Sequence, residues 1–219
     1  RAAAMYGVDL VGGDTTSSVN GLTLSVTVLG SVAKGKITYR KGASVNDILM
    51  VSGDLGRAYL GLQVLEREKA VFMANPTIQP ELDAFDFLVK KQLMPEARKD
   101  VVEVLAALGV TPTSMIDISD GLASEALHLC KASALGCVLF ENKMPYHEDV
   151  VLNAETFGLA PLTCAMNGGE DYELLMTIPI EEHEKVQANP NLTIIGHMVP
   201  TDDGIHLVTT RIFLNQQGS

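Results

Sequence analysis

Apolar and polar residues follow two different periods along this chain of 219 residues. Between Pro95 and Gly109 the apolar residues recur at spacings of three and four, and this period predicts an amphipathic helix that proline opens and glycine closes. From residue 22 to residue 29 apolar and polar residues alternate, and this period of two predicts a strand with one buried face. Both kinds of element are therefore expected in the chain.

Further elements follow from short apolar runs bounded by glycine, proline or acidic residues, and from apolar residues at helical spacing. Because helices and strands mix without strict alternation, we expect an α+β fold in which helices cover a mixed sheet. Strands are expected over residues 8–11, 36–40, 48–51, 115–118, 136–140, 172–178, 192–195 and 205–208, and the remaining helices over residues 55–68, 80–91, 120–134, 147–157 and 180–188.

The start of the chain has an unusual pattern. Residues 1–6 have the pattern of the last turns of a helix that Gly7 closes, but no start signal precedes them and the first residue is not methionine. A domain boundary is expected near residues 40–44. We therefore expect residues 1–38 to be the tail of a preceding α/β domain whose front half is missing, and residues 39–219 to form a carboxy-terminal domain.

Composition narrows the class of protein. Hydrophobic residues make up 47% of the chain, enough for a substantial core, and the formal net charge is −11 at pH 7. Such a charge disfavours binding to duplex nucleic acid or to an anionic membrane, and no apolar run approaches the roughly 20 residues that span a bilayer. Three cysteines without C-x-x-C spacing indicate reduced thiols, so we expect a cytoplasmic protein.

The segment SMIDISDGL at residues 114–122 places two carboxylates and a hydroxyl where a predicted strand turns into a predicted helix. Asp117 and Ser119 lie on one side of the strand because side chains alternate, and Asp120 follows at the turn. Asp117 and Asp120 could hold metal ions such as Mg²⁺, and Ser119 could donate to a phosphate. The alternative is that Ser119 or Asp120 only caps the helix, although an acid at Asp117 inside an apolar strand would still need a partner or a metal ion.

Two further segments combine glycine with acidic residues. In LVGGDTT at residues 10–16, Gly12 and Gly13 would let a phosphate approach the backbone and Asp14 would supply a cation ligand, although a tight turn explains them as well. In NGGEDYELL at residues 167–175, Glu170 and Asp171 could accept hydrogen bonds from a cationic substrate, although a solvated turn is an equal alternative. Three such segments in one chain suggest a metal and phosphate site.

Taken together, these segments resemble thiamine-monophosphate kinases, members of the superfamily that includes aminoimidazole ribonucleotide synthetase and selenophosphate synthetase. The matches occur in the family's order and span most of the chain. The resemblance implies the carboxy-terminal domain of the aminoimidazole ribonucleotide synthetase-like fold, preceded by the tail of an amino-terminal domain that binds ATP and magnesium. The matching segments are LVGGDTT at 10–16, YRKGAS at 39–44, VSGDLG at 51–56, LMPEAR at 93–98, MIDISDGL at 115–122 and NGGEDYELL at 167–175.

The resemblance also implies an activity. It is phosphoryl transfer from ATP to thiamine monophosphate, giving thiamine diphosphate, in homodimers that use Mg²⁺. No side chain is implied as a catalytic nucleophile, since such transfer depends mostly on positioning and charge neutralisation. From its residue type alone, Arg40 could stabilise a polyphosphate or be an ordinary surface arginine. The site residues implied by motif are Gly13 and Asp14 for nucleotide and magnesium, Arg40 and Ser119 for ATP, Asp117 and Asp120 for magnesium, and Glu170 for the substrate.

The chain also departs from the family pattern. The resemblance implies further metal-binding aspartates and a dimer interface in an amino-terminal domain, of which only residues up to about 32 are present, and a later aromatic substrate contact that cannot be assigned in this chain. We therefore expect the intact protein to be an active kinase and this chain alone to be inactive. The alternatives are another ATP-dependent reaction of the superfamily, such as ring closure on a formylglycinamidine nucleotide, and a non-catalytic fragment that binds Mg-nucleotide weakly.

Overall fold

The computed structural model describes residues 2–209 of the chain. The chain divides into two compact units, and the division falls between Ile37 and Thr38. The assignment of residues 1–38 to a preceding α/β domain, and of the remainder to a carboxy-terminal domain, stays a prediction.

The first unit contains one short helix, α1, Ala2–Tyr6. It ends at Gly7, as the pattern predicted. Gly7 has a left-handed backbone (φ 65°), and the Val8 amide donates to the Ala3 carbonyl at 2.9 Å across the end of the helix.

The strands expected over residues 8–11 and 22–29 are wrong, because none of these residues lies in a strand. The apolar side chains of the second segment are open to solvent, with Leu22 90% and Val28 78% exposed. An alternating pattern forms a strand only when a neighbouring strand pairs with its backbone and an apolar surface covers one face. Nothing within the described part of the first unit provides either.

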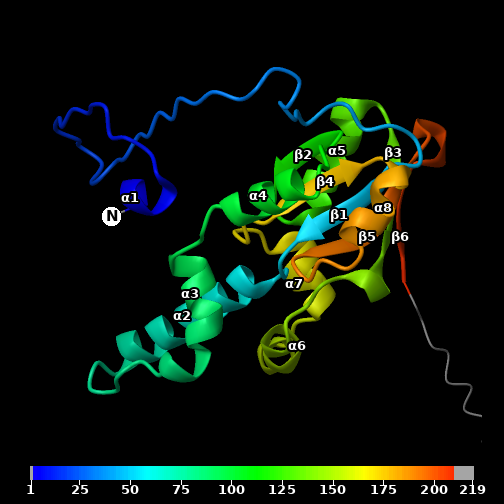
Figure 1. The fold of residues 1–219 in the computed structure, drawn as a ribbon. Helices are drawn as coiled ribbons and strands as arrows, with labels where there is room; N and C mark the ends of the chain where they lie inside the picture. The colour runs from blue at the N-terminus through cyan, green and yellow to red at the C-terminus, as the bar shows by residue number, and fades with distance from the viewer. Residues whose placement is uncertain (1, 210–219) are drawn as a thin grey trace, which may run out of the picture. The chain divides into compact units, whose positions relative to one another are not determined.

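The second unit is built on one six-stranded sheet (Figure 1). Its strand order is β2-β4-β1-β5-β3-β6, and neighbouring strands are antiparallel except β3 and β6, which are parallel. The expected α+β fold with a mixed sheet is therefore confirmed. The strands are β1 Ile48–Ser52, β2 Ser114–Asp117, β3 Gly136–Phe140, β4 Leu174–Ile178, β5 Leu192–Val199 and β6 Ile205–Val208.

Strand ends agree with the expected ranges where a glycine or a turn bounds the apolar run. β3 and β6 have the expected bounds, whereas β5 continues four residues past the expected end at residue 195. Residues 36–40 form no strand. The Tyr39 carbonyl accepts from the Met115 amide at 2.9 Å beside the sheet.

Helices surround the sheet, and each expected helix is present at least in part. α7 was not expected, and the range 180–188 is a 3₁₀ turn followed by a single short helix. No helix among residues 2–209 is both long and apolar enough to cross a bilayer. The helices are α2 Arg57–Ala74, α3 Asp86–Leu93, α4 Lys99–Ala107, α5 Leu122–Ser133, α6 Glu148–Ala154, α7 Pro161–Asn167 and α8 His183–Val186, with 3₁₀ turns η1 Asp83–Phe85, η2 Glu141–Lys143, η3 Glu155–Phe157, η4 Ile180–Glu182 and η5 Thr201–Asp203.

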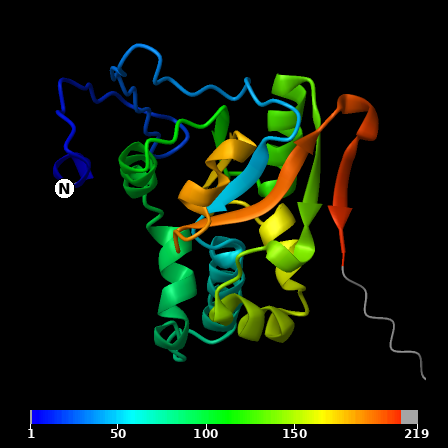
Figure 2. The ribbon, with the colours of Figure 1, turned by 45° about the vertical axis from the view of Figure 1, so that its right-hand side comes forward.

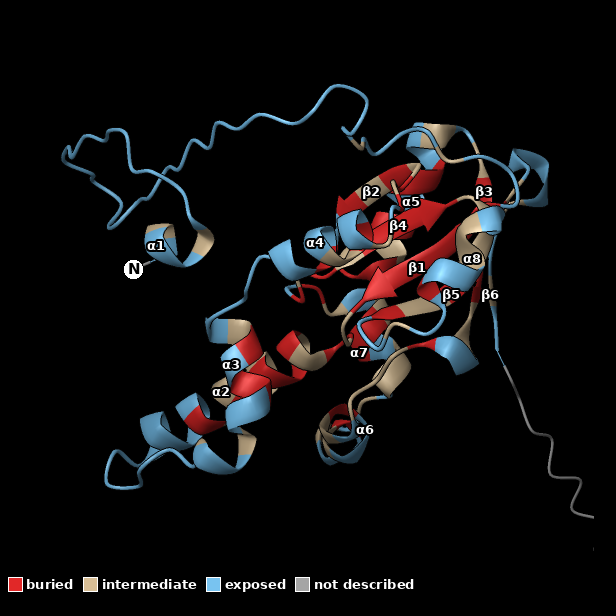
Figure 3. Cartoon of the chain, in the orientation of Figure 1, coloured by how far each residue is buried: buried red, intermediate tan, exposed pale blue. Residues whose placement is uncertain are grey.

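Both faces of β1 are buried, which explains why its apolar run is continuous rather than alternating. Leu49 and Val51 pack in a core with α5 and α7, and Ile48 and Met50 pack on the opposite face with α4 and α8. A smaller apolar cluster joins α2, α3, α6 and α7. Figure 2 shows the sheet between these helices, and Figure 3 shows the buried residues concentrated along its central strands.

The three cysteines are free and buried, as expected of reduced thiols. Cys130 of α5 and Cys137 of β3 share a hydrogen bond, which raises the pKa of Cys137 and lowers that of Cys130. Burial raises the pKa of Cys164 to about 11. Because a thiol reacts as its thiolate, the raised pKa values of Cys137 and Cys164 favour a role for these two side chains as small apolar residues of the core.

Candidate functional site

Two loops that are far apart in sequence lie against each other in the second unit. One joins β2 to α5, and the other leads from α7 into β4. The Ile118 amide donates to the Glu173 carbonyl at 2.7 Å, and the Tyr172 amide donates back to the Ile118 carbonyl at 2.8 Å. The Glu170 amide donates to the Ser119 carbonyl at 2.8 Å. We refer to residues 118–121 and 168–173 as the paired loops, which bring the MIDISDGL and NGGEDYELL segments together.

Two glycines permit close approaches of the backbone around the paired loops. Gly169 has a left-handed backbone (φ 69°), and a Cβ atom there would lie 2.5 Å from the Ser119 carbonyl oxygen. Gly121 has φ 110°, and a Cβ atom there would lie 2.6 Å from the Met166 carbonyl oxygen. Only glycine combines these backbone angles with such contacts at no steric cost. Gly169 therefore serves the contact between the two loops, and Gly121 serves the contact of the first loop with the end of α7.

The paired loops, with the end of β2, expose three carboxylates. Asp117 and Asp120 are exposed, and neither has an ion pair or a side-chain hydrogen bond within the described residues. Glu170, also exposed, accepts from the Tyr172 hydroxyl at 3.2 Å. Partial burial raises the pKa of Tyr172, and the negative charges of Glu170, Asp117 and Asp120 raise it further. Three carboxylates therefore lie close enough to one phenol to act on it together, without a basic side chain to neutralise Asp117 or Asp120.

The alternative that Ser119 or Asp120 caps the following helix is wrong. α5 begins after Gly121, and no side chain caps it. Instead Glu125, inside the helix and only 2% exposed, accepts from the Ser119 hydroxyl at 3.4 Å and from the Asp120 amide at 3.3 Å. Both contacts are long, so they hold the loop loosely. Glu125 could not be singled out from the sequence, because an acid in the first turns of a helix is ordinary.

Asp171 does not face a ligand, which corrects the hypothesis that it binds a cationic substrate. Its side chain is fully buried. Its two oxygens accept from the Gly56 amide at 2.6 Å and the Ala58 amide at 3.0 Å, at the start of α2. Burial raises the pKa of Asp171 to about 6, although these two hydrogen bonds act to lower it. Asp171 thus joins α2 to the second of the paired loops.

The free energy of unfolding should depend on pH through the protonation of Asp171. Because the pKa of this carboxyl is raised to about 6 in the folded state, the folded protein holds the proton more tightly than the unfolded chain does. The stability due to that proton is present at low pH and is lost as the pH rises through the folded-state pKa. A rise of about two pKa units corresponds to about 3 kcal/mol.

Urea unfolding of the wild type and of Asp171→Asn, from about pH 4 to about pH 7.5, measures this dependence on pH. The difference in free energy of unfolding, wild type minus variant, should decrease as the pH rises and level off above about pH 6. A difference that increases with pH would mean that the bonds from Gly56 and Ala58 outweigh burial, and would contradict the prediction.

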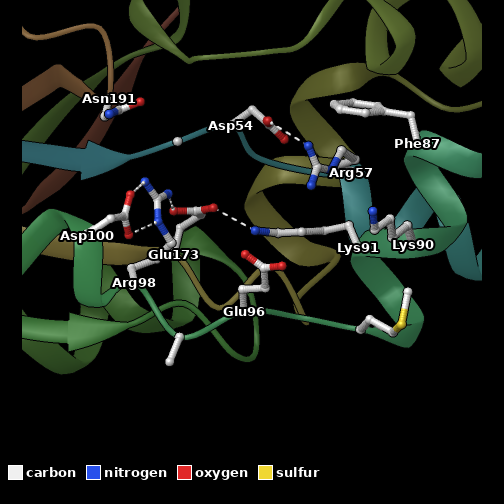
Figure 4. A pocket seen from close by; sticks show the side chains of 13 residues that line it. Asp54, Arg57, Phe87, Lys90, Lys91, Glu96, Arg98, Asp100, Glu173 and Asn191 are labelled. Carbon is white, nitrogen blue, oxygen red and sulfur yellow. Dashed lines mark hydrogen bonds and ion pairs between the residues drawn. The ribbon is translucent and has the colours of Figure 1, made fainter. Parts of the chain in front are cut away.

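Glu173 forms a second set of contacts that the sequence did not reveal. It lies beside a pocket of about 470 Å³ into which the VSGDLG and LMPEAR segments also project (Figure 4). Glu173 pairs with Lys91 at 2.6 Å and with Arg98, and Arg57 pairs with Asp54 at 3.2 Å. Four basic and four acidic side chains line the pocket, so its charges balance and favour neither an anion nor a cation. They are Arg57, Lys90, Lys91 and Arg98, and Asp54, Glu96, Asp100 and Glu173.

The remaining residues implied by motif lie elsewhere in the chain. Gly13 and Asp14 belong to the first unit, where the Asp14 carboxylate accepts from the Thr15 amide at 2.8 Å and is otherwise exposed. Arg40 belongs to the second unit and is exposed. The roles of these three residues stay predictions, as do those of Asp117, Ser119, Asp120 and Glu170.

The chain resembles known proteins over most of its length. Thiamine-monophosphate kinase of Bacillus subtilis is 34% identical over 182 residues, which cover 83% of this chain and 52% of that protein. Thiamine-monophosphate kinase of Aquifex aeolicus is 32% identical over 201 residues, which cover 90% of this chain and 59% of that protein. No family model matches the chain. The chain thus spans about half the length of the curated relatives it matches.

Solved structures agree with these relatives. "AaThiL complexed with AMPPCP and TMP" has a TM-score of 0.66 at 29% identity, covering 78% of this chain and 50% of that one. The thiamine monophosphate kinase of Aquifex aeolicus has a TM-score of 0.64 at 30% identity, covering 79% and 55%. HypE of Escherichia coli, a hydrogenase maturation protein, shares the fold alone, with a TM-score of 0.55 at 14% identity over 84% of this chain and 52% of that one. By sequence and by fold, the chain belongs to the thiamine-monophosphate kinase family.

Proposed function

We propose that this protein, when extended to the full length of its relatives, transfers the terminal phosphoryl group of ATP to thiamine monophosphate and releases thiamine diphosphate. The observation that carries the proposal is the contact between the paired loops, which brings Asp117, Asp120 and Glu170 close enough to Tyr172 to raise its pKa together. Phosphoryl transfer depends on positioning and charge neutralisation, and it needs no protein nucleophile. The relative solved with AMPPCP and TMP supports a nucleotide and a thiamine phosphate as the two substrates.

Mg²⁺ is the cation that these carboxylates would hold. Asp117 and Asp120 offer hard oxygen donors that no lysine or arginine of the described chain neutralises. Mg²⁺ keeps several waters and completes its shell with substrate phosphates, so it does not require a full protein cage. Within residues 2–209 no three His, Cys, Asp or Glu side chains gather as such a cage would. When bound, Mg²⁺ would offset the repulsion between the terminal phosphates of the two substrates.

The roles of the other residues follow the family motifs. Gly13 and Asp14 would contact the nucleotide phosphates and their magnesium, and Arg40 would contact ATP. Ser119 would also contact ATP, and the long 3.4 Å bond to Glu125 leaves its hydroxyl free to turn toward a phosphate. Glu170 would contact thiamine monophosphate.

We further propose that the protein acts in the cytoplasm as a homodimer. Three free cysteines support a reducing compartment. The dimer rests on the family resemblance.

Turnover by the protein extended to its relatives' full length, called the full-length protein from here on, tests the proposal. It is expected to form thiamine diphosphate from ATP and thiamine monophosphate, and to lose this activity when Mg²⁺ is chelated. The chain of 219 residues is expected to be inactive alone. Faster turnover of a formylglycinamidine nucleotide would favour another reaction of the superfamily. Calorimetry without saturable Mg-ATP binding would indicate a non-catalytic scaffold.

A further inference from the structure

The carboxylate of Glu173 is held by side chains from three separate segments. It is 3% exposed and accepts from Ser52 Oγ, at the end of β1, at 2.5 Å. It also accepts from Lys91 Nζ of α3 at 2.6 Å and from Arg98 Nη1, just before α4. Asp100 holds the other side of the Arg98 guanidinium with two hydrogen bonds, at 2.9 and 2.8 Å. Figure 4 shows Arg98 between Asp100 and Glu173, with Lys91 reaching Glu173 from the opposite direction.

The backbone of Glu173 holds the first of the paired loops, residues 118–121. The Glu173 carbonyl accepts from the Ile118 amide at 2.7 Å, and the next residue back, Tyr172, donates to the Ile118 carbonyl at 2.8 Å. Ile118 stands between Asp117 and Ser119, so any shift of Glu173 is passed to the residues proposed to bind metal and nucleotide. Glu173 is thus fixed by its side chain and fixes its neighbours by its backbone.

The conformation of the second loop requires such support. Glu170 and Tyr172 have left-handed backbones, with φ of 62° and 50°, which cost about 1–2 kcal/mol for each residue with a side chain. Glu170 is exposed and Tyr172 is partly exposed, whereas Asp171 and Glu173 are buried. A strained backbone persists only where its surroundings hold it, and the two buried acids hold the segment on either side of Tyr172.

We propose that Glu173 is a positioning residue for the paired loops, holding Glu170 and the carboxylates of Asp117 and Asp120 in one arrangement through its contacts with Lys91, Arg98 and Ser52. This inference rests on the proposed function of the same site. The competing explanation is that Glu173 only completes a buried ion pair, in which case its loss lowers stability and leaves the loops as they are.

A matched pair of variants separates the two explanations. Glu173→Gln removes the charge from the proposed positioning residue. Glu68→Gln removes the charge from another acid, 9% exposed, that accepts from the Glu81 amide and from Arg67 Nε at 2.9 Å each. If Glu173→Gln does not fold, Arg98→Lys replaces it, because lysine keeps the charge beside Glu173 and loses the paired bonds to Asp100.

The first measurement needs no enzymatic activity. NMR titration of ring-labelled tyrosines in the chain of 219 residues, with Tyr172→Phe to identify the signal, gives the pKa of Tyr172. Burial raises this pKa, and the charges of Glu170, Asp117 and Asp120 raise it further. Glu173→Gln should lower it toward the ordinary value by letting the loops separate. Arg98→Lys, which keeps the charge of Glu173, should lower it as well, whereas Glu68→Gln should leave it unchanged. An unchanged pKa in folded Glu173→Gln overturns the inference.

The second measurement uses the full-length protein. Glu173→Gln should raise the KM for thiamine monophosphate about tenfold, since Glu170 is displaced, while Glu68→Gln changes it less than about twofold. Equal KM values in the two variants, at a similar loss of stability, would support the purely structural explanation. If the wild type forms no thiamine diphosphate, the proposed function fails, but the tyrosine titration still decides whether Glu173 positions the loops.

Discussion

The full-length protein with Asp120→Asn is expected to form thiamine diphosphate at least about a hundred times more slowly than the wild type, at unchanged fold. The Asp120 carboxylate is exposed and has no partner within the described residues, so its replacement removes no contact that holds the fold. Asparagine keeps the size of the side chain and removes the charge that Mg²⁺ would require. Steady-state rates with ATP and thiamine monophosphate, measured over a range of Mg²⁺ concentrations, test the loss.

Asp202→Asn provides the matched control. Asp202 is an exposed aspartate in the turn η5, away from the paired loops in sequence, and its replacement changes the net charge by the same amount. The control should keep the rate of the wild type within about twofold, as surface substitutions usually do. A normal rate in Asp120→Asn, with normal circular dichroism, would remove Asp120 from the metal ligands. A loss in both variants would point to overall charge instead.

Much of the fold could be predicted from the chain itself because local signals coincide with its elements. The strand at 136–140 is bounded by a glycine and a polar turn, and the helix from Lys99 to Ala107 has a clear apolar stripe. The helix Pro161–Asn167 was missed because its seven residues are nearly all apolar or small, which hides the helical period. The strand expected over residues 22–29 is absent for a different reason. Whether a segment pairs with another strand cannot be predicted from that segment's own residues.

Which acids of GGEDYEL are buried and which are exposed could not be predicted from the sequence. Four adjacent residues from Glu170 to Glu173 give no local sign of which carboxylate faces outward. That choice depends on left-handed backbones at Glu170 and Tyr172, residue types that rarely adopt them. It also depends on the partners of Asp171 and Glu173, which lie more than 70 residues earlier in the chain. The contact between the two motifs agrees with the expectation for these two acid–glycine segments, whereas LVGGDTT lies in the first unit and its share in the same site stays a prediction.

Gly169→Ala is expected to separate the paired loops and to lower both stability and activity. Alanine at φ 69° costs about 1–2 kcal/mol in backbone strain alone. Its Cβ atom would also lie 2.5 Å from the Ser119 carbonyl oxygen, so the two loops must move apart. That movement breaks the bond between the Glu170 amide and the Ser119 carbonyl. We expect a total loss of about 2–4 kcal/mol in the free energy of unfolding, measured by urea denaturation.

Gly158→Ala is the matched control for Gly169→Ala. The difference between the two variants gives the part of the loss that comes from the contact between the loops. Gly158 has nearly the same backbone (φ 64°), but no atom of residues 2–209 outside its own neighbours lies within 4 Å of the position that a Cβ atom would take. Gly158→Ala should therefore lower the free energy of unfolding only by the strain energy of about 1–2 kcal/mol. The full-length protein with this substitution should keep its turnover. Gly169→Ala should lose turnover about a hundredfold, because the groups proposed to bind phosphate and substrate would no longer share one geometry. Equal effects of the two variants would show that the contact between the loops carries no function, and the proposed site would then have to be sought elsewhere in the chain.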